Sequence, residues 1–450
     1  NGVGPRAVEI RRDSNRGCRY AVSVQQGRPS STKALIAAWL GWAFDGLDGY
    51  LYIILAVPLV TRLLTEQNGG IAPDPKDVGW KAAIIQATFL VGWAVGGAVF
   101  GRIGDRLGRA RTLTLTVLTY AIFTGAVFFA TSWWHLLIFR FIAALGIGGE
   151  WAAGSALVSE TLHSRHRAWA SATLQSGYIV GCIAASFVVK WMSQWWTTDF
   201  DPRMPFLVGI VPALLTLWIR SAVPEPEDWV KASRSTAPPR VRELFSGALA
   251  RITILLTLLT SIALTTAWAF LFFGPQLVQK LGKDAGMEKT DTQVLVSRIS
   301  IIYLTVNIFA NYFATYLARF IGYRWAFFLL MLAGLGTFAL AFHSPPNLDN
   351  VTLLYCLVAF FALGLFGLFP LYIPPLFPVL VRTLGAGFTY NVGRLVSAAG
   401  TLLALVAGDS LGTAQGVSHA LWWIGLLFIP GMAVCLFLPE PPRDEARVAT

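Results

Sequence analysis

Residues 101–111 read Gly101-Arg102-Ile103-Gly104-Asp105-Arg106-Leu107-Gly108-Arg109-Ala110-Arg111. This stretch lies between two long apolar runs, and its glycines permit a tight turn between adjacent helices. Its arginines place the turn on the cytoplasmic side of a membrane, because short cytoplasmic loops carry an excess of Lys and Arg. Asp105 is positioned to meet a neighbouring arginine or the positive end of a helix. A positively charged turn with no role beyond topology is the alternative interpretation.

The composition excludes a soluble globule. The chain has 450 residues, of which 55% are hydrophobic and 13% are charged, against about 25% charged residues in an average soluble domain. Apolar stretches of roughly 20 residues, long enough to cross a hydrocarbon core of about 30 Å, recur along almost the whole length. The net charge of +11 comes from basic residues in short loops beside these stretches. It therefore indicates topology, and no nucleic-acid partner is predicted.

Twelve apolar runs predict an all-α membrane protein with twelve transmembrane helices. The first six runs lie at about 34–62, 80–101, 112–132, 134–158, 169–191 and 204–221. The second six lie at about 250–279, 298–319, 323–343, 350–373, 384–408 and 418–438. Cations concentrate in alternate loops and in both tails, so both termini are predicted to be cytoplasmic.

Five segments follow from this pattern. Residues 1–33 form a polar basic cytoplasmic tail without the apolar core of a signal peptide, and residues 439–450 form a C-terminal cytoplasmic tail. Between them we expect a six-helix half at 34–221, a cytoplasmic linker at 222–249 that is rich in Pro and charged residues, and a second six-helix half at 250–438.

The two halves carry weak internal repeats. The first half reads Glu160, Arg167 and Gln175, and the second reads Pro375, Arg382 and Tyr390 at the same spacings. Two similar halves are typical of transporters built from repeats, with the binding site near the midplane where the halves meet.

The turn at 101–111 resembles the signature of the major facilitator superfamily, Gly-x-x-x-Asp-Arg-x-Gly-Arg, at every fixed position. The second-half copy at 317–324 lacks the Asp. The resemblance implies the major facilitator fold, in which two six-helix halves rock about a central site. Gating at the signature loop and the inner face is then expected from Gly101, Asp105, Arg106, Gly108, Arg109, Glu160, Arg167, Arg382 and Arg394.

Two further stretches resemble the carboxylate and sialate proton symporters of that superfamily. One is Gly146-Ile147-Gly148-Gly149-Glu150-Trp151, continuing to Glu160, and the other runs from Leu376-Phe377-Pro378 to Arg394. The resemblance implies secondary active, proton-coupled symport of a small organic monocarboxylate such as lactate, pyruvate, sialic acid or an aromatic acid. Relatives often carry an acid before Leu-Phe-Pro, where this chain has Pro375, so the inner-gate charge pair expected there is in question.

Four ionisable residues inside apolar runs are candidates for proton coupling. A charge in hydrocarbon costs about 2.5 to 3.5 kcal/mol and normally has a partner or a function. Asp45 and Asp48 lie three residues apart in the first run, and Arg140 and Glu150 lie in the fourth. We expect Asp45 or Asp48 to take up a proton, with Arg140 as its counter-ion, and the resemblance implies the same pairing. A structural ion pair is the alternative.

Substrate contacts are expected from a cation and from uncharged groups at mid-membrane depth. A planar guanidinium matches a carboxylate with two parallel hydrogen bonds. Arg394 is instead expected to snorkel to the inner surface, and amides also bond helix to helix. The predicted substrate-binding residues are Arg140, Gln175, Trp268, Asn307 and Asn311.

The remaining sequence predicts no metal site, no cofactor and no catalytic centre. The five histidines and four cysteines show no ligand spacing, and neither a phosphate-binding loop nor a nucleophile elbow occurs in a suitable setting. The expected partners are a small organic anion, protons and the lipid bilayer of the cell membrane, with the protein acting as a monomer. The alternatives are a proton-coupled sugar or polyol porter, a non-transporting membrane sensor and, least favoured, a membrane enzyme.

Overall fold

A computed structural model describes residues 31–107, 109–161, 167–195, 200–214, 241–378, 381–407 and 413–440. These residues form helices and turns and contain no strand. The first half contains α1 (Ser31–Gln67), α2 (Pro75–Leu107), α3 (Arg109–Ala126), η1 (Val127–Phe129), α4 (Trp133–Thr161), α5 (Arg167–Trp195) and η3 (Met204–Ile210). The second half contains η4 (Val241–Phe245), α8 (Gly247–Asp284), α9 (Lys289–Ile321), α10 (Tyr323–Phe342), α11 (Val351–Val358), α12 (Phe369–Tyr372), α13 (Arg382–Ala407), α14 (Ala414–Gly425) and α15 (Phe428–Leu436).

The all-helical prediction is confirmed, and each predicted apolar run coincides with a helical segment over its described residues. Residues 215–221 of the sixth run lie outside the described ranges. Among the residues that the structure describes, eight helices are long and apolar enough to cross a membrane by length and composition. The count of twelve spans and the cytoplasmic position of both termini stay predictions.

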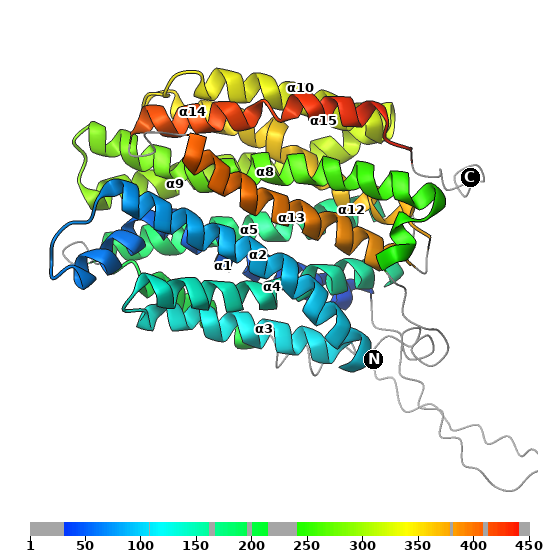
Figure 1. The fold of residues 1–450 in the computed structure, drawn as a ribbon, viewed down its shortest axis with the longest axis horizontal. Coiled ribbons are helices and arrows are strands. Elements are labelled where there is room, and N and C mark those ends of the chain that lie inside the picture. The colour runs from blue at the N-terminus through cyan, green and yellow to red at the C-terminus, as the bar shows by residue number, and fades with distance from the viewer. Residues whose placement is uncertain are drawn as a thin grey trace, which may run out of the picture.

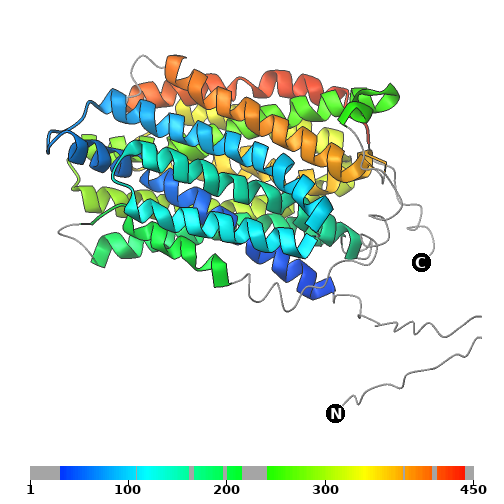
Figure 2. The same ribbon diagram turned by 60° about the horizontal axis from the view of Figure 1, so that its bottom comes forward.

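The helices lie side by side in one elongated bundle (Figures 1 and 2). In Figure 1, α10, α14 and α15 form the upper edge and α3 forms the lower edge. Within the bundle α1 packs along α5, α2 along α4 and α8 along α13. The most extensive contacts between helices of different halves are those of α2 with α13 and of α5 with α9. The central site lies among these helices.

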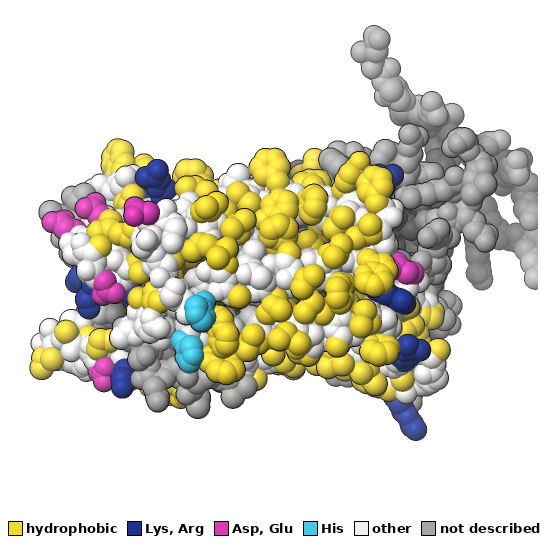
Figure 3. All heavy atoms as spheres, turned by 90° about the horizontal axis from the view of Figure 1, so that it is seen from above, with side chains coloured by type: hydrophobic (Ala, Val, Ile, Leu, Met, Phe, Trp, Pro, Cys, Tyr) yellow, Lys and Arg dark blue, Asp and Glu magenta, His cyan; other side chains and the backbone are white. Residues whose placement is uncertain are grey.

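The outer surface of the bundle is that of a protein embedded in hydrocarbon. On the face in Figure 3, apolar side chains cover the middle of the molecule, and charged side chains gather at its two ends. Large apolar residues of the helices, such as Ile122 of α3, Phe309 of α9 and Leu340 of α10, are exposed. A soluble protein rarely exposes so extended an apolar surface, so we assign this belt to lipid contact.

Two glycines allow helices of the first half to touch backbone to backbone. A Cβ added at Gly46 of α1 would lie 2.1 Å from the carbonyl oxygen of Tyr178 on α5. A Cβ added at Gly148 of α4 would lie 2.1 Å from the carbonyl oxygen of Trp93 on α2. Real side chains do not fit at such distances, so these glycines permit the approach that brings Trp93 and Tyr178 to the centre of the bundle.

The tenth apolar run is not one regular helix. After α11 it continues as the π-helical turn η5 (Ala359–Leu363) and the 3-10 helix η6 (Gly364–Leu368) before α12 and η7 (Pro374–Leu376). Asn307 of α9 donates a hydrogen bond of 2.9 Å to the carbonyl oxygen of Ala359, the first residue of η5. A side chain that enters the backbone ladder of a neighbouring helix is a recognised cause of such an irregularity.

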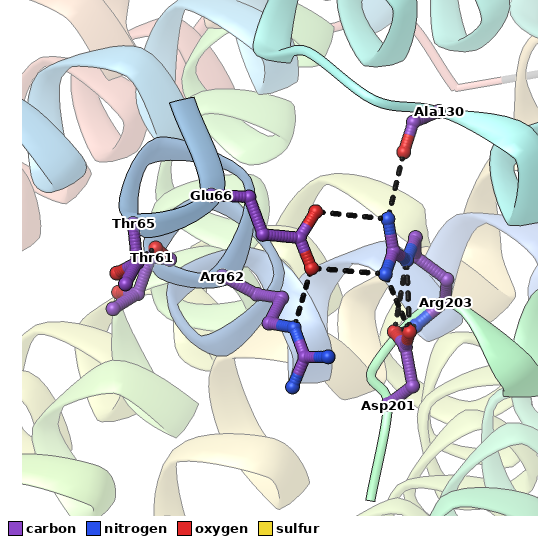
Figure 4. Close-up of polar contacts among 7 residues, drawn as sticks. All are labelled: Thr61, Arg62, Thr65, Glu66, Ala130, Asp201 and Arg203. Atoms are coloured by element: carbon purple, nitrogen blue, oxygen red, sulfur yellow. Dashed lines mark hydrogen bonds and ion pairs between the residues drawn. The ribbon is translucent and has the colours of Figure 1, made fainter. Parts of the chain in front are cut away.

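A charged cluster closes one end of the first half (Figure 4). Arg203 donates hydrogen bonds to Asp201 at 2.6 Å, to Glu66 of α1 at 3.1 Å and to the carbonyl oxygen of Ala130 at 3.1 Å. Glu66 also accepts a hydrogen bond of 2.6 Å from Arg62. Partial burial acts to raise the pKa of Asp201, but hydrogen bonds from Arg203 outweigh it and leave that pKa below its ordinary value. The cluster ties the end of α1 to the segments before α4 and η3.

Candidate functional site

A small cavity of about 70 Å³ lies at the centre of the bundle. Both halves contribute side chains to its wall. The first half contributes Trp42, Trp93, Gln175, Tyr178, Ile179 and Cys182. The second half contributes Leu264, Ala267, Trp268, Leu271, Leu304, Asn307, Leu363, Phe366, Tyr390 and Arg394. Among these lining residues Arg394 is the only charged one, and Gln175 and Asn307 carry the amides. The cavity is therefore a mainly apolar and aromatic chamber with one cation.

Arg394 does not reach the membrane surface, and the prediction that it snorkels was wrong. Its side chain is 2% exposed. The guanidinium carbon lies 4.3 Å from the ring centroid of Trp93 and 4.8 Å from that of Tyr390. Its Nη1 donates a hydrogen bond of 2.8 Å to Asn391 Oδ1. Arg394 lies twelve residues after the start of α13, about 18 Å along the helix axis, which is too deep for its side chain to span.

Four aromatic rings form one connected wall of the cavity. Trp93 packs against Trp42 with ring centroids 6.2 Å apart and against Trp268 at 5.6 Å. Trp42 in turn packs against Tyr178 at 5.3 Å. These distances lie in the range that favours edge-to-face and tilted ring pairs. Because Trp268 belongs to the second half and the other three to the first, the wall also joins the two halves.

Asp48 of α1 and Arg140 of α4 form a buried ion pair. Arg140 Nη1 lies 2.8 Å from each carboxylate oxygen of Asp48, and Thr124 of α3 donates to Asp48 Oδ1. The Arg140 side chain is 0% exposed, and its guanidinium carbon lies 4.3 Å from the ring centroid of Phe89. A buried charge pair without further hydrogen bonds is costly, and the Thr124 hydroxyl supplies one of them.

Asp45, one helical turn before Asp48, has a different environment. Its side chain is fully buried, and it interacts electrostatically with Arg394 and with Tyr178. The two aspartates of α1 therefore differ. Asp48 forms a direct ion pair with Arg140 within the first half, whereas Asp45 lies near enough to Arg394 of the second half to interact with its charge.

Polar contacts join the two halves on the side of the cavity toward the end of α1. Tyr50 of α1 donates a hydrogen bond of 3.0 Å to Ser300 of α9 and also bonds to the hydroxyl of Tyr303. Further along, Gln279 of α8 donates a hydrogen bond of 3.1 Å to the carbonyl oxygen of Ile54. We call Tyr50, Ser300 and Tyr303 the tyrosine seal.

Of the predicted substrate-binding residues, Gln175, Trp268 and Asn307 line the cavity. Asn311 is fully buried and bonds to the carbonyl oxygen of Asn307 at 2.8 Å, a contact within α9. Arg140 is not among the lining residues described, because its guanidinium lies against Phe89 and Asp48. The cation at the cavity is Arg394.

Several predicted coupling and gating residues fall outside the described part of the molecule. Gly108 lies between the described ranges, and the side chains at Gly101, Asp105, Arg106, Arg109, Glu150, Glu160, Arg167 and Arg382 are likewise outside it. Their predicted roles stay predictions.

The sequence interpretation missed the aromatic wall and the depth of Arg394. A signal for Arg394 was present, since it lies deep in its apolar run with Tyr390 one turn earlier. Trp42, Trp93 and Tyr178 gave no comparable signal, because membrane spans contain many aromatic residues at their ends as well.

Comparison with known proteins identifies the family to which this chain belongs. The family model of the Major Facilitator Superfamily matches residues 38–374. A protein of Cupriavidus pinatubonensis named "Probable 4-methylmuconolactone transporter" is 30% identical over 413 residues, which cover 90% of this chain and 91% of that protein. The sialic acid transporter NanX of Escherichia coli is 28% identical over 381 residues, covering 84% of this chain and 88% of that protein.

The fold is also that of solved transporters. The partially occluded, inward-open structure of the xylose transporter XylE from E. coli superposes with a TM-score of 0.71 at 17% identity, covering 91% of this chain and 98% of that one. At that identity the likeness concerns the fold alone. The family match and the sequence relatives are transporters rather than enzymes. The chain therefore belongs to the Major Facilitator Superfamily and is a multi-pass protein of the cell membrane.

Proposed function

We propose that the protein carries out proton-coupled symport of a small organic monocarboxylate by alternating access. The observation that carries this proposal is the position of Arg394, the one cation among the described lining residues of a central cavity whose wall is mainly aromatic and apolar and includes the amides of Gln175 and Asn307. A single guanidinium in such surroundings suits a substrate with a single carboxylate. Two of the relatives fit this substrate class, because they are named as transporters of sialic acid and of niacin, each of which carries one carboxyl group.

Carboxylate binding at Arg394 is supported by its existing contacts. The guanidinium is held between the rings of Trp93 and Tyr390 at 4.3 and 4.8 Å, and one nitrogen is bonded to Asn391. A guanidinium fixed in this way loses little further freedom when it binds a carboxylate. Charge-assisted hydrogen bonds are also strong in apolar surroundings.

Proton coupling is assigned to the Asp48–Arg140 pair, with Asp45 as the second acidic group. A proton on Asp48 would neutralise the carboxylate and weaken its attraction for Arg140, which packs on Phe89. An electrostatic interaction already connects Asp45 with Arg394, so a substrate anion at Arg394 competes with the charge on Asp45. Proton uptake and substrate binding then favour each other, as symport requires.

The proposal includes the topology needed for this cycle. Twelve spans in two six-helix halves, with both tails in the cytoplasm and one copy of the chain as the transporting unit, are supported by the alternating loop cations and by the two similar halves. The tyrosine seal then closes the outer side of the cavity in this conformation.

Uptake into proteoliposomes tests the proposal. The substrates are radiolabelled lactate, pyruvate, sialic acid and benzoate, with xylose as a neutral comparison, measured with and without an inward proton gradient. Arg394→Ala removes the cation from the cavity, and Arg298→Ala, at an exposed position on α9, is the matched control.

We expect gradient-driven accumulation of at least one carboxylate, lost in Arg394→Ala and retained in Arg298→Ala. Accumulation of xylose alone would replace the proposal with a sugar porter. If the Arg394→Ala variant still accumulated a carboxylate, the carboxylate would be bound somewhere other than at Arg394 in this cavity.

A further inference from the structure

Two indole N–H groups in the cavity wall lack a hydrogen-bond partner among the residues that the structure describes. They belong to Trp42 of α1 and Trp93 of α2, whose side chains are 5% and 1% exposed and which both line the cavity. An indole nitrogen is a donor only, and buried donors in native proteins are nearly always bonded. A donor left without an acceptor inside a protein is costly, so an acceptor supplied by a ligand recovers that loss.

The two indoles are not equivalent. The ring centroid of Trp93 lies 4.3 Å from the guanidinium carbon of Arg394. A substrate atom that accepts a hydrogen bond from the Trp93 N–H would therefore belong to the carboxylate end of the substrate, which Arg394 binds. The rings near the Arg394 guanidinium are those of Trp93 and Tyr390, whereas Trp42 contacts Trp93 and Tyr178 through its ring. The Trp42 N–H therefore offers a second contact point, separate from the guanidinium.

Several other polar groups in the wall are less suited to select an acceptor. The Tyr178 hydroxyl also has no partner among the described residues, but a hydroxyl both donates and accepts, so it does not distinguish an acceptor oxygen from a donor group. The amide nitrogen of Asn307 is already bonded to Ala359. The cysteine thiol of Cys182 donates to the carbonyl oxygen of Gly46 at 3.6 Å. Gln175 carries both a donor and an acceptor, so it does not distinguish an acceptor oxygen from a donor group.

We propose, resting on the carboxylate transport proposed above, that Trp42 is a second recognition point which donates its indole N–H to an oxygen at the end of the substrate away from the carboxylate. The preferred substrate is then a monocarboxylate with a flat apolar body, which packs against the rings, and a hydroxyl, carbonyl or lactone oxygen at its far end. Because Arg394 and Trp42 belong to different halves, such a substrate bridges them and stabilises the closed cavity.

A pair of matched ligands tests this inference. In 4-hydroxybenzoate and 4-methylbenzoate a hydroxyl and a methyl group of similar size occupy the same place, so only the first offers an acceptor to Trp42. Equilibrium binding of both is measured to the full chain in lipid nanodiscs. One hydrogen bond between neutral groups corresponds to a difference of about three- to tenfold in Kd. We therefore expect wild-type protein to prefer 4-hydroxybenzoate by about that factor.

Two variants locate the effect. Trp42→Phe keeps an aromatic ring and removes the N–H, so the preference is expected to fall to about one while the affinity for 4-methylbenzoate changes little. Trp39→Phe is the matched control, because Trp39 lies one turn away on α1 and its N–H is already bonded to Ser176 at 3.2 Å. It is expected to keep the wild-type preference.

Equal binding of the two ligands to wild-type protein would overturn the inference, even if Trp42→Phe failed to fold. A preference that persists in Trp42→Phe, or an equal loss of affinity for both ligands, would also overturn it. Parallel uptake of lactate, pyruvate and sialic acid separates this failure from failure of the proposed function. If any of these carboxylates accumulates while the aromatic pair fails to bind, only the second recognition point is wrong. If no carboxylate binds or accumulates, the proposed function is wrong.

Discussion

Phe89 and Trp93, one turn apart on α2, each lie under a different buried arginine. The guanidinium carbon of Arg140 is 4.3 Å from the Phe89 ring centroid, and that of Arg394 is 4.3 Å from the Trp93 ring centroid. The two rings pack edge to face with centroids 5.6 Å apart. The Asp48–Arg140 pair and the cavity are thus connected by side chains in direct contact, which gives a physical route between proton binding and substrate binding.

Replacement of Phe89 tests that route. Phe89→Leu keeps an apolar side chain and removes the ring face under Arg140, an interaction of about 0.5 to 2 kcal/mol. We expect the steady-state accumulation driven by a proton gradient to fall severalfold, while exchange of substrate across the membrane without a gradient continues. The measurement is proteoliposome uptake in both modes. An equal loss in both modes would mean that Phe89 supports the fold and not the coupling.

The Asp48–Arg140 pair is expected to contribute strongly to stability. Removal of one partner leaves a buried charge alone and costs about 3 to 5 kcal/mol. Arg140→Gln should therefore lower the thermal unfolding temperature clearly more than the surface change Arg298→Ala. Adding Asp48→Asn to Arg140→Gln should recover part of the loss, because the remaining charge is then also removed. Additive losses in a double-mutant cycle would show that the two residues are not coupled.

The tyrosine seal gives a prediction about access to the cavity. Tyr50→Phe removes the hydroxyl that bonds to Ser300 and Tyr303, so open conformations on that side should become more populated. Cys182 lines the cavity and serves as a reporter once Cys18, Cys356 and Cys435 are replaced by Ser. We expect a membrane-impermeant thiol reagent added outside to label Cys182 severalfold faster in Tyr50→Phe. An unchanged rate would show that the seal does not control access.

The cluster around Arg203 predicts a dependence of stability on pH. Asp201 has a pKa below its ordinary value of 3.8, so the folded state binds its proton more weakly than the unfolded state. The resulting stability is present above the ordinary pKa and is lost as the pH falls through the lowered one. Because the pair is partly exposed, its contribution is about 1 kcal/mol or less.

Thermal unfolding in detergent, followed from pH 7 into the acid range, checks this effect. Arg203→Ala should lower the unfolding temperature slightly at pH 7, and the difference from wild type should shrink at the acid end. A difference between the two proteins that stays constant over the whole range would contradict the assignment.

The fold was predictable because lipid imposes a simple rule. Each crossing needs about 20 apolar residues with every backbone group bonded inside its own helix, so the apolar runs locate the helices closely. The same rule identified Asp48 and Arg140, since charges inside apolar runs call for a partner. It could not decide between Asp45 and Asp48, because both lie on the same side of α1 and the choice depends on how α4 packs.

The cavity was less predictable, since it depends on which side chains face one another between halves. Trp42, Trp93 and Trp268 are far apart in sequence and meet only after α1, α2 and α8 have packed, helped by close contacts at glycines such as Gly148. Arg394 was predicted to reach the inner membrane surface because its depth along α13 was not taken into account. Its distance from the start of that helix would have placed its side chain inside the bundle.

The most direct test of the account follows protons when only substrate drives the movement. Proteoliposomes with weak internal and external buffers receive a carboxylate that the uptake assay has identified, with no pH gradient at the start, and the external pH is recorded. Symport predicts external alkalinisation as substrate enters, absent in Arg394→Ala and retained in Arg298→Ala. Entry of substrate into wild-type vesicles without any change in external pH would contradict proton coupling.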